Sequence, residues 1–229
     1  MSNSSLIDCT ILSPNHSGKR THSIDRITPH CVVGQLDEYA IAKCFKTSSR
    51  EASCNYGIGT NGKVVMCVEE CNRSWCSSSK ENDQRAVTIE CASDKTHPYY
   101  MNDKVYQKLI DLCTDICIRN NKTKLLWFND KTKTLNYTPN EDEMVLTVHR
   151  WFKNKACPGD WLYNRLGDLA NEVTNRINTM YNVIGKKVDN EKSIYKVQVG
   201  AYLNKQNALN QKAKLEKEGY QTIIVEEKR

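Results

Sequence analysis

The sequence predicts an α/β protein with a mixed central β-sheet flanked by helices, plus a small C-terminal β-α-β unit. Two observations predict it: short runs rich in Val, Ile, Tyr and Cys recur through the first 185 residues, and helix-like segments with apolar residues three to four apart alternate with them. A sheet with helices packed on it is the simplest arrangement that buries both kinds of apolar face. The chain has 229 residues, enough for one sizeable core and a smaller unit.

Five strands are expected in the first part of the chain. They are Ile27–Val33, Cys54–Gly59, Lys63–Val68, Ala86–Cys91 and Lys124–Phe128. Asn61 and Gly62 lie between the second and third runs, and both residue types tolerate the positive φ angles of a tight turn. We therefore expect these two runs to pair as a β-hairpin.

Three helices are expected from apolar residues at helical spacing, namely Asp37–Phe45, Asn102–Asn121 and Asp160–Tyr181. In the last of them Leu162, Leu166, Leu169 and Val173 share one face. Such a face has to pack on another element, and the expected sheet is the nearest candidate.

The polar segment Ile184–Ser193 has no periodicity, so we expect a linker there, between a domain at residues 1–183 and a unit at residues 194–229. In this unit a strand from Ile194, a helix from Lys205 to Glu218 and a second strand are expected, with Gly219 capping the helix. About 36 residues are too few for a secure core. The unit should therefore dock on something, pair with a copy of itself, or be a fragment of a longer domain.

Composition excludes several classes of protein. The net charge of +6 is spread along the chain with no dense basic run, so nucleic acid is not expected as a partner. No apolar stretch approaches the roughly 20 residues that span a bilayer, and the N-terminus lacks the features of a secretory signal. Eleven cysteines, an odd number, favour reduced thiols over a disulfide framework. A structural zinc at Cys67, Cys71 and Cys76 is disfavoured because the CxxC spacing is missing.

Two histidines and a cysteine are candidate metal ligands. His30 ends an apolar run, His149 follows the apolar run Met144–Val148, and Cys157 comes eight residues later, before Pro-Gly. Two imidazoles and one thiolate suit zinc, with a fourth position left for the water that hydrolysis needs. On spacing alone, packed or turn positions explain the same three residues.

Five blocks of sequence occur in an order typical of one family. They are Ile27–His30, Ser53–Val64, Cys71–Trp75, Ala86–Glu90, and His149 with Lys155–Gly159. Together, over roughly Asp25 to Tyr163, they resemble the zinc N-acetylmuramoyl-L-alanine amidases related to phage endolysins and peptidoglycan-recognition proteins. The resemblance implies a mixed sheet with helices packed on it, a groove that holds Zn²⁺, and hydrolysis of the lactyl–L-Ala amide of peptidoglycan.

The resemblance also implies a role for each matching residue. His30, His149 and Cys157 match the zinc ligands. Glu90 matches a carboxylate near the zinc-bound water, where it acts as general base, and Lys155 matches a lysine that stabilises the oxyanion. An ordinary ion pair for Glu90 and a solvated loop position for Lys155 are the alternatives.

Three further residues are expected to line the groove and bind substrate: Asn55, Trp75 and Asn82. A buried position is the alternative for Trp75. Two positions depart from the family. Cys54 stands where some relatives have a tyrosine, which favours Glu90 over a tyrosine-assisted mechanism, and Cys76 stands where histidine is frequent.

The C-terminal unit resembles the first half of a SPOR domain, through Tyr195–Tyr202, Asn207 and Leu215–Tyr220. That family binds peptidoglycan. We therefore expect a modular endolysin or autolysin, made in the cytoplasm without a signal peptide, that acts on the bacterial cell wall after release at lysis. Its partner is peptidoglycan, without membrane insertion, and residues 194–229 are a candidate surface for self-association. The alternatives are a non-catalytic peptidoglycan-recognition protein and a cytosolic muropeptide-recycling amidase.

Overall fold

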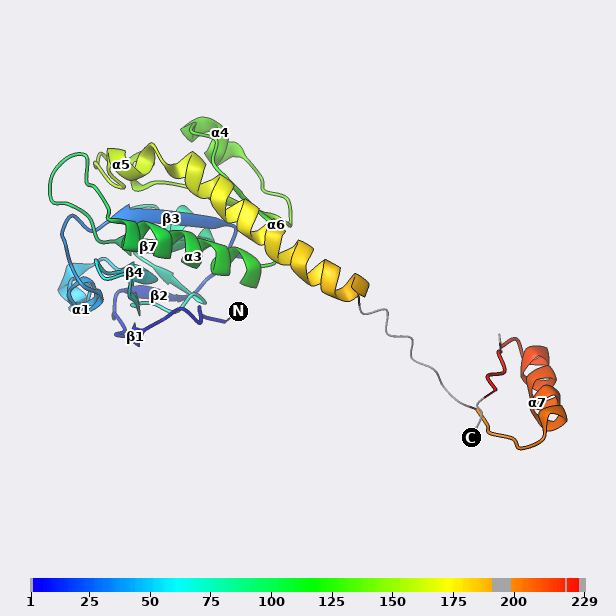
Figure 1. The fold of residues 1–229 in the computed structure, drawn as a ribbon. Coiled ribbons are helices and arrows are strands. Elements are labelled where there is room, and N and C mark those ends of the chain that lie inside the picture. Colours follow the sequence, from blue (N-terminus) through cyan, green and yellow to red (C-terminus); the bar gives the residue numbers. More distant parts are fainter. Residues whose placement is uncertain (1, 191–198, 221, 227–229) are drawn as a thin grey trace. The chain divides into compact units, whose positions relative to one another are not determined.

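A seven-stranded mixed β-sheet is the framework of the computed structural model, which describes residues 2–190, 199–220 and 222–226 (Figure 1). The strand order is β1-β5-β4-β7-β3-β9-β8, and all neighbouring pairs are parallel except β4 and β5. In this order the strands are Cys9–Thr10, Val64–Met66, Tyr56–Ile58, Ala86–Cys91, Arg26–Cys31, Glu143–Leu146 and Lys124–Leu126. The expected fold class is confirmed, and so is the hairpin, formed by β4 and β5.

The two central strands, β3 and β7, set the two faces of the sheet. They pair in register over six residues, with His30 opposite Glu90, and the next pair along, Gly57 with Glu90, joins β4 to β7. Because side chains alternate along a strand, the positions of His30, Glu90 and Gly57 lie on one face of the sheet. Tyr56 and its partner on the adjacent strand, Ile89, lie on the other face. A Cβ on Gly57 would come within 2.6 Å of Ile41, so glycine is needed where the helix over this face approaches β4.

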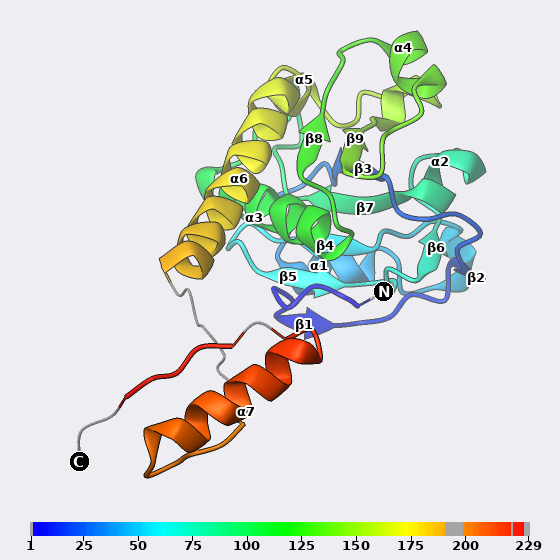
Figure 2. The same ribbon diagram turned by 90° about the vertical axis from the view of Figure 1, so that its right-hand side faces the viewer.

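Helices cover both faces. The face of His30 and Glu90 carries α1 (Glu38–Lys43) and α2 (Lys80–Arg85). The opposite face carries α3 (Asp103–Arg119), beside which α6 (Leu166–Asn190) runs, as Figures 1 and 2 show. Two short helices, α4 (Lys131–Asn136) and α5 (Asp160–Tyr163), and two 3₁₀ turns, Ser48–Arg50 and His149–Trp151, lie in the connections. A small antiparallel pair, β2 (His16–Lys19) with β6 (Asn72–Ser74), completes the first unit.

Several boundaries differ from those expected. The expected helix Asp160–Tyr181 is two helices, α5 and α6, and α6 continues to Asn190 through most of the expected linker. The strands β1, β2, β6 and β9 and the helices α2 and α4 were not expected, because none carries a long periodic apolar pattern. No helix in the described part of the chain is long and apolar enough to cross a membrane.

The chain divides into two compact units, Met1–Gly185 and Lys186–Arg229. In the second, helix α7 (Lys205–Lys217) confirms the expected helix, and Gly219 follows it with a φ of 93°, as a capping glycine requires. The described residues 199–204 and 222–226 form no strand, and most of the first expected strand lies outside the described residues. None of the α7 residues is buried.

A buried ion pair joins α3 to the sheet. Glu70 is fully buried and accepts hydrogen bonds from the Tyr56 hydroxyl and from Nη2 of Arg119, each at 2.6 Å. Burial and the neighbouring carboxylate of Glu70 raise the pKa of Tyr56, so its phenol remains a donor. Through Glu70, these three residues attach α3 to β4 on the face of the sheet opposite the His30–Glu90 face.

Replacing Arg119 by methionine is expected to lower the free energy of unfolding by about 3–5 kcal/mol, because the buried carboxyl group of Glu70 would lose its cationic partner. Urea unfolding followed by tryptophan fluorescence measures the change, since all four tryptophans lie in the first unit. The control is Arg176→Met: Arg176 pairs with Asp111 at 2.7 Å but its side chain is 33% exposed, so the expected loss is at most about 1 kcal/mol. Equal losses in the two variants would contradict this view of the pair.

Candidate metal centre and substrate groove

Three donors from distant parts of the chain meet at one edge of the sheet. His30 lies near the carboxyl end of β3, His149 follows the carboxyl end of β9, and Cys157 closes the next loop. Sγ of Cys157 is 3.2 Å from Nδ1 of His30, and the two imidazole rings are 5.1 Å apart between centroids. One donor atom from each residue lies within 4.8 Å of the others. The structure therefore brings together all three residues expected as ligands.

The local fold explains why these side chains converge. Parallel strands end at the same edge of a sheet, and open α/β sheets place ligands at their carboxyl ends. Thr147 in the segment after β9 shares a hydrogen bond of 2.7 Å with Thr28 of β3, which holds His149 over its neighbour strand. Arg150 donates to the carbonyl oxygen of Cys157 from its backbone N–H at 3.2 Å, and this contact returns the loop to the site.

The two histidines are in the neutral form that a metal ion requires of an imidazole ligand. His30 is 1% exposed, and burial, followed by the nearby His149, holds its pKa well below the usual value. Burial and Lys155 lower the pKa of His149. Both rings are therefore neutral, with lone pairs free for coordination. Burial raises the pKa of the Cys157 thiol, so a bound cation is what would stabilise its thiolate.

Glu90 lies beside this centre. Its Oε1 is 4.0 Å from Nδ1 of His30 and accepts a weak hydrogen bond from Sγ of Cys76 at 3.8 Å. Its Oε2 is buried and has no hydrogen-bond partner among the residues that the structure describes, and the same is true of Nε2 of His30. Burial raises the pKa of Glu90 to about 7, although Cys76 and Arg50 act in the opposite direction. The carboxyl group can thus both accept and return a proton near neutral pH.

Two neighbours of the candidate ligands, Cys76 and Ser78, were missed by sequence reasoning. Cys76 forms, with His30 and Glu90, a second group of donors within 4.8 Å. Its position was noted only as a departure from histidine, and that departure was the available signal. Ser78 places its hydroxyl 3.0 Å from Nε2 of His149 and has a φ of 62°. No sequence pattern pointed to this serine.

A groove of about 350 Å³ opens beside the donors. Trp75, His149 and Lys155 line it; Trp75 was expected to line a substrate groove, and Lys155 to stabilise the oxyanion. The indole N–H of Trp75 donates to the Ser17 hydroxyl at 2.7 Å, which fixes the ring at the wall of the groove. The other charged residues that line the groove are the cations Arg50, Arg73 and Lys80 and the carboxylates Glu51 and Asp83, so that with Lys155 the cations outnumber the carboxylates. The groove is therefore suited to a ligand that carries negative charge.

The two asparagines expected in the groove lie inside the protein. Asn55 and Asn82 are both 0% exposed. The amide of Asn55 accepts from the backbone N–H of Thr88 at 3.1 Å and donates to backbone carbonyls of the β5–β6 connection. The amide of Asn82 bonds to the hydroxyls of Thr28 and Thr147. In this structure both asparagines hold strands and loops together, and we assign them no contact with substrate.

The sheet and the donors at its edge define the class: an α/β protein with a candidate metal centre of two imidazoles and one thiol. Residues 20–160, more than half of the chain, match the family described as N-acetylmuramoyl-L-alanine amidase, and residues 166–228 match the SPOR domain. The chain belongs to the N-acetylmuramoyl-L-alanine amidase family. The resemblances to both families that the sequence indicated are confirmed.

Solved structures similar to this chain share little sequence with it. The structure of PlyL is 15% identical and has a TM-score of 0.48, with 72% of this chain and 94% of that chain covered. The Ph2119 endolysin from Thermus scotoductus MAT2119 bacteriophage Ph2119 is 12% identical, with a TM-score of 0.49 and coverage of 72% and 98%. The Staphylococcus aureus hydrolase AmiA in complex with its ligand is 12% identical, with a TM-score of 0.48 and coverage of 76% and 85%. No curated protein sequence matches the chain.

Proposed function

We propose that this protein is a zinc-dependent N-acetylmuramoyl-L-alanine amidase that hydrolyses the amide between the lactyl group and L-alanine in peptidoglycan. The observation that carries the proposal is the convergence of His30, His149 and Cys157 at the carboxyl ends of β3 and β9. All three lie within the segment that matches the amidase family. A donor set of two neutral imidazoles and one thiol, open on one side to a groove, fits a catalytic zinc site.

His30, His149 and Cys157 would hold the ion, and their convergence within 4.8 Å suits them to it. When bound, zinc supplies Lewis-acid polarisation of the amide carbonyl and a more acidic water. In such sites, hydrogen bonds from neighbouring groups commonly fix the orientation of the ligand rings. The Ser78 hydroxyl would do this for His149, whereas Nε2 of His30 has no hydrogen-bond partner among the described residues.

Glu90 would manage the proton. A carboxyl group with a pKa of about 7 takes a proton from the attacking water and returns it to the alanine nitrogen as the amide breaks. Lys155, exposed at the rim of the same groove, would hold positive charge near the developing oxyanion. Trp75 would line the path of the substrate.

The same reasoning extends to the biological role. We propose an endolysin or autolysin in which residues 1–183 cut the wall and the SPOR unit near the C-terminus anchors it there. Expression in the cytoplasm and release at lysis would bring it to its substrate. The SPOR match over residues 166–228 supports an anchor, because soluble muropeptide fragments need none.

The test is mass spectrometry of purified sacculi digested with and without a chelator. We expect new N-terminal alanine and intact glycan strands without the chelator, and a loss of at least about a hundredfold in release with it, because removing the metal removes the polarising group. Release of reducing sugar would identify a glycosidase instead. Wall binding without any cleavage, unaffected by the chelator, would favour a recognition protein.

A further inference from the structure

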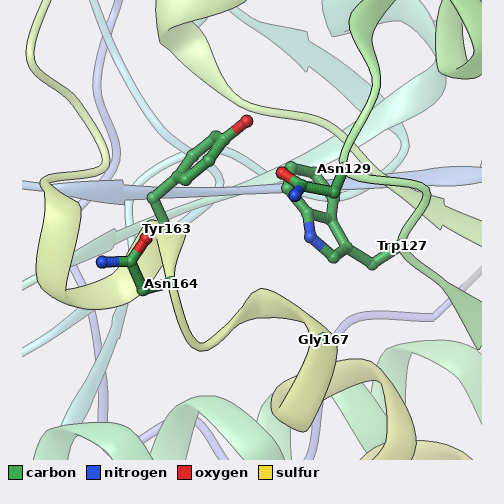
Figure 3. A pocket seen from close by; sticks show the side chains of 5 residues that line it. All are labelled: Trp127, Asn129, Tyr163, Asn164 and Gly167. Atoms are coloured by element: carbon green, nitrogen blue, oxygen red, sulfur yellow. The ribbon is translucent and has the colours of Figure 1, made fainter.

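A second hollow lies at the same edge of the sheet as the donors, past the end of β8 and beside the start of α6. It measures about 280 Å³ and is lined by Trp127, Asn129, Tyr163, Asn164 and Gly167. Figure 3 shows the Trp127 and Tyr163 side chains next to one another at its wall, with Asn129 beside the indole and Asn164 beside Tyr163. The volume is close to the lower bound of roughly 300 Å³ for small-molecule sites, so it suits one ring rather than an extended ligand.

Strand order places this hollow next to the metal centre. β8, β9, β3 and β7 are parallel neighbours, so their carboxyl ends form one row along the sheet edge. Trp127 directly follows β8, just as His149 follows β9. The Trp127 indole stacks on that of Trp151 at 5.1 Å and 3°, and Trp151 ends the 3₁₀ turn that begins with His149. One short turn therefore separates the hollow from a candidate ligand.

The walls of the hollow are held by contacts outside it. The Tyr163 ring meets Trp127 edge-on at 5.5 Å, and the guanidinium of Arg150 lies 4.6 Å from its centre. Arg150 is in turn paired with Asp160 at 2.9 Å. A site whose aromatic walls are fixed in advance loses little side-chain entropy when a ligand enters.

The chemistry of the two sites differs. The groove beside the donors is lined by four cations, Arg50, Arg73, Lys80 and Lys155, and by two carboxylates, Glu51 and Asp83. The hollow on the β8 side offers two aromatic rings and two side-chain amides, and none of its five lining residues is charged. Aromatic surface with a few amide donors and acceptors suits a neutral ring that has both C–H faces and polar substituents. A pyranose with an N-acetyl group has this character, whereas a peptide stem brings carboxylates.

We propose that the hollow at Trp127 and Tyr163 binds one N-acetylhexosamine ring of the glycan strand, while the basic groove takes the peptide stem. This assignment rests on the proposed function, because the lactyl–alanine amide joins a sugar to a peptide and so needs one site of each kind on opposite sides of the metal. The hollow is thus a specificity-determining subsite for the sugar side of the cut bond.

Gly167, in the first turn of α6, offers a way to block the hollow. A Cβ added there would meet only Cδ1 of Trp127 at 3.8 Å, an ordinary contact, so alanine fits. A glutamine at the same position would extend its amide into the space that the ring needs. The pair Gly167→Ala and Gly167→Gln therefore separates filling of the hollow from loss of the glycine.

The experiment is a titration of the full chain with a soluble N-acetylglucosamine oligosaccharide, followed by tryptophan emission. All four tryptophans lie in Met1–Gly185, so the SPOR unit gives no signal. We expect a saturable change for the natural protein and for Gly167→Ala, and affinity weakened about tenfold or more in Gly167→Gln. Asn164→Ala, an exposed position, should weaken binding roughly fivefold through one lost hydrogen bond. Trp161→Phe, outside the hollow, should leave it unchanged.

Two results would overturn the proposal: no saturable change in the natural protein, or the same affinity in Gly167→Gln. The titration contains no peptide and no bond that an amidase cuts, so its outcome is independent of catalysis. Saccharide binding without release of alanine from sacculi would refute the proposed function alone. Normal release with no saccharide binding would refute the subsite alone.

Discussion

Replacing Cys157 by serine is expected to lower the zinc content of the purified protein and its release of alanine termini from cell wall together. The fall in activity should be at least about a hundredfold, since loss of even the outer partners of metal ligands costs 10–100-fold. The reason is the position of Sγ, 3.2 Å from Nδ1 of His30 and within reach of His149. A hydroxyl is a weaker zinc ligand than a thiolate and would leave two imidazoles with too few donors. Metal analysis per chain and mass spectrometry of digested wall measure the two effects.

Cys44→Ser is the matched control for this variant. Cys44 is also half-buried, but its thiol donates to the carbonyl oxygen of Ala40 within α1 and belongs to neither group of candidate donors. Zinc content and activity should both stay at the natural level. A Cys157→Ser protein that keeps its zinc and its activity would contradict the assignment of the thiol as a ligand.

The parts of the fold that were predictable are those whose apolar pattern is complete within one segment. β7 has the expected bounds, Ala86–Cys91, and α3 lies within one or two residues of the expected helix. β9 was missed although its apolar run was noticed, because four residues give too short a pattern to assign. α6 extends nine residues past its expected end at Tyr181, since the polar stretch that follows reads equally well as a linker or as an exposed helix.

The site was predictable as a set of residues but not as a geometry. The order of motifs pointed to His30, His149 and Cys157, and strand register then explains why they meet. Register also places Glu90 opposite His30, a relation that pairing between distant strands decides and local sequence does not contain. Asn55 and Asn82 were expected to be polar residues of the groove. Their amides are instead occupied inside the protein, where buried polar groups need partners.

Replacing Glu90 by glutamine is expected to lower the rate of alanine release by about 10²–10⁴-fold while zinc content stays at the natural level. Glutamine has the shape of glutamate but cannot accept a proton at neutral pH, so it tests proton transfer and little else. Zinc content and the rate of alanine release have to be measured separately, because Glu90 belongs to the second group of candidate donors, with His30 and Cys76. A loss of zinc along with activity would mean that the carboxylate holds the ion, and would contradict its assignment as the base.

Glu81→Gln is the control for Glu90→Gln, because Glu81 is exposed on α2 and belongs to neither group of candidate donors; this variant should keep its zinc content and its rate of alanine release. Burial is what distinguishes the two carboxyl groups. Glu90 has a pKa of about 7 because its charge is costly in a buried site, and its Oε2 has no partner within the described residues. A carboxylate with unmet hydrogen-bonding capacity beside two neutral imidazoles is unfavourable for folding alone. This cost is the physical ground for proposing a role of Glu90 in the reaction, and an isosteric variant that binds zinc and fails to cut the amide would identify that role as proton transfer.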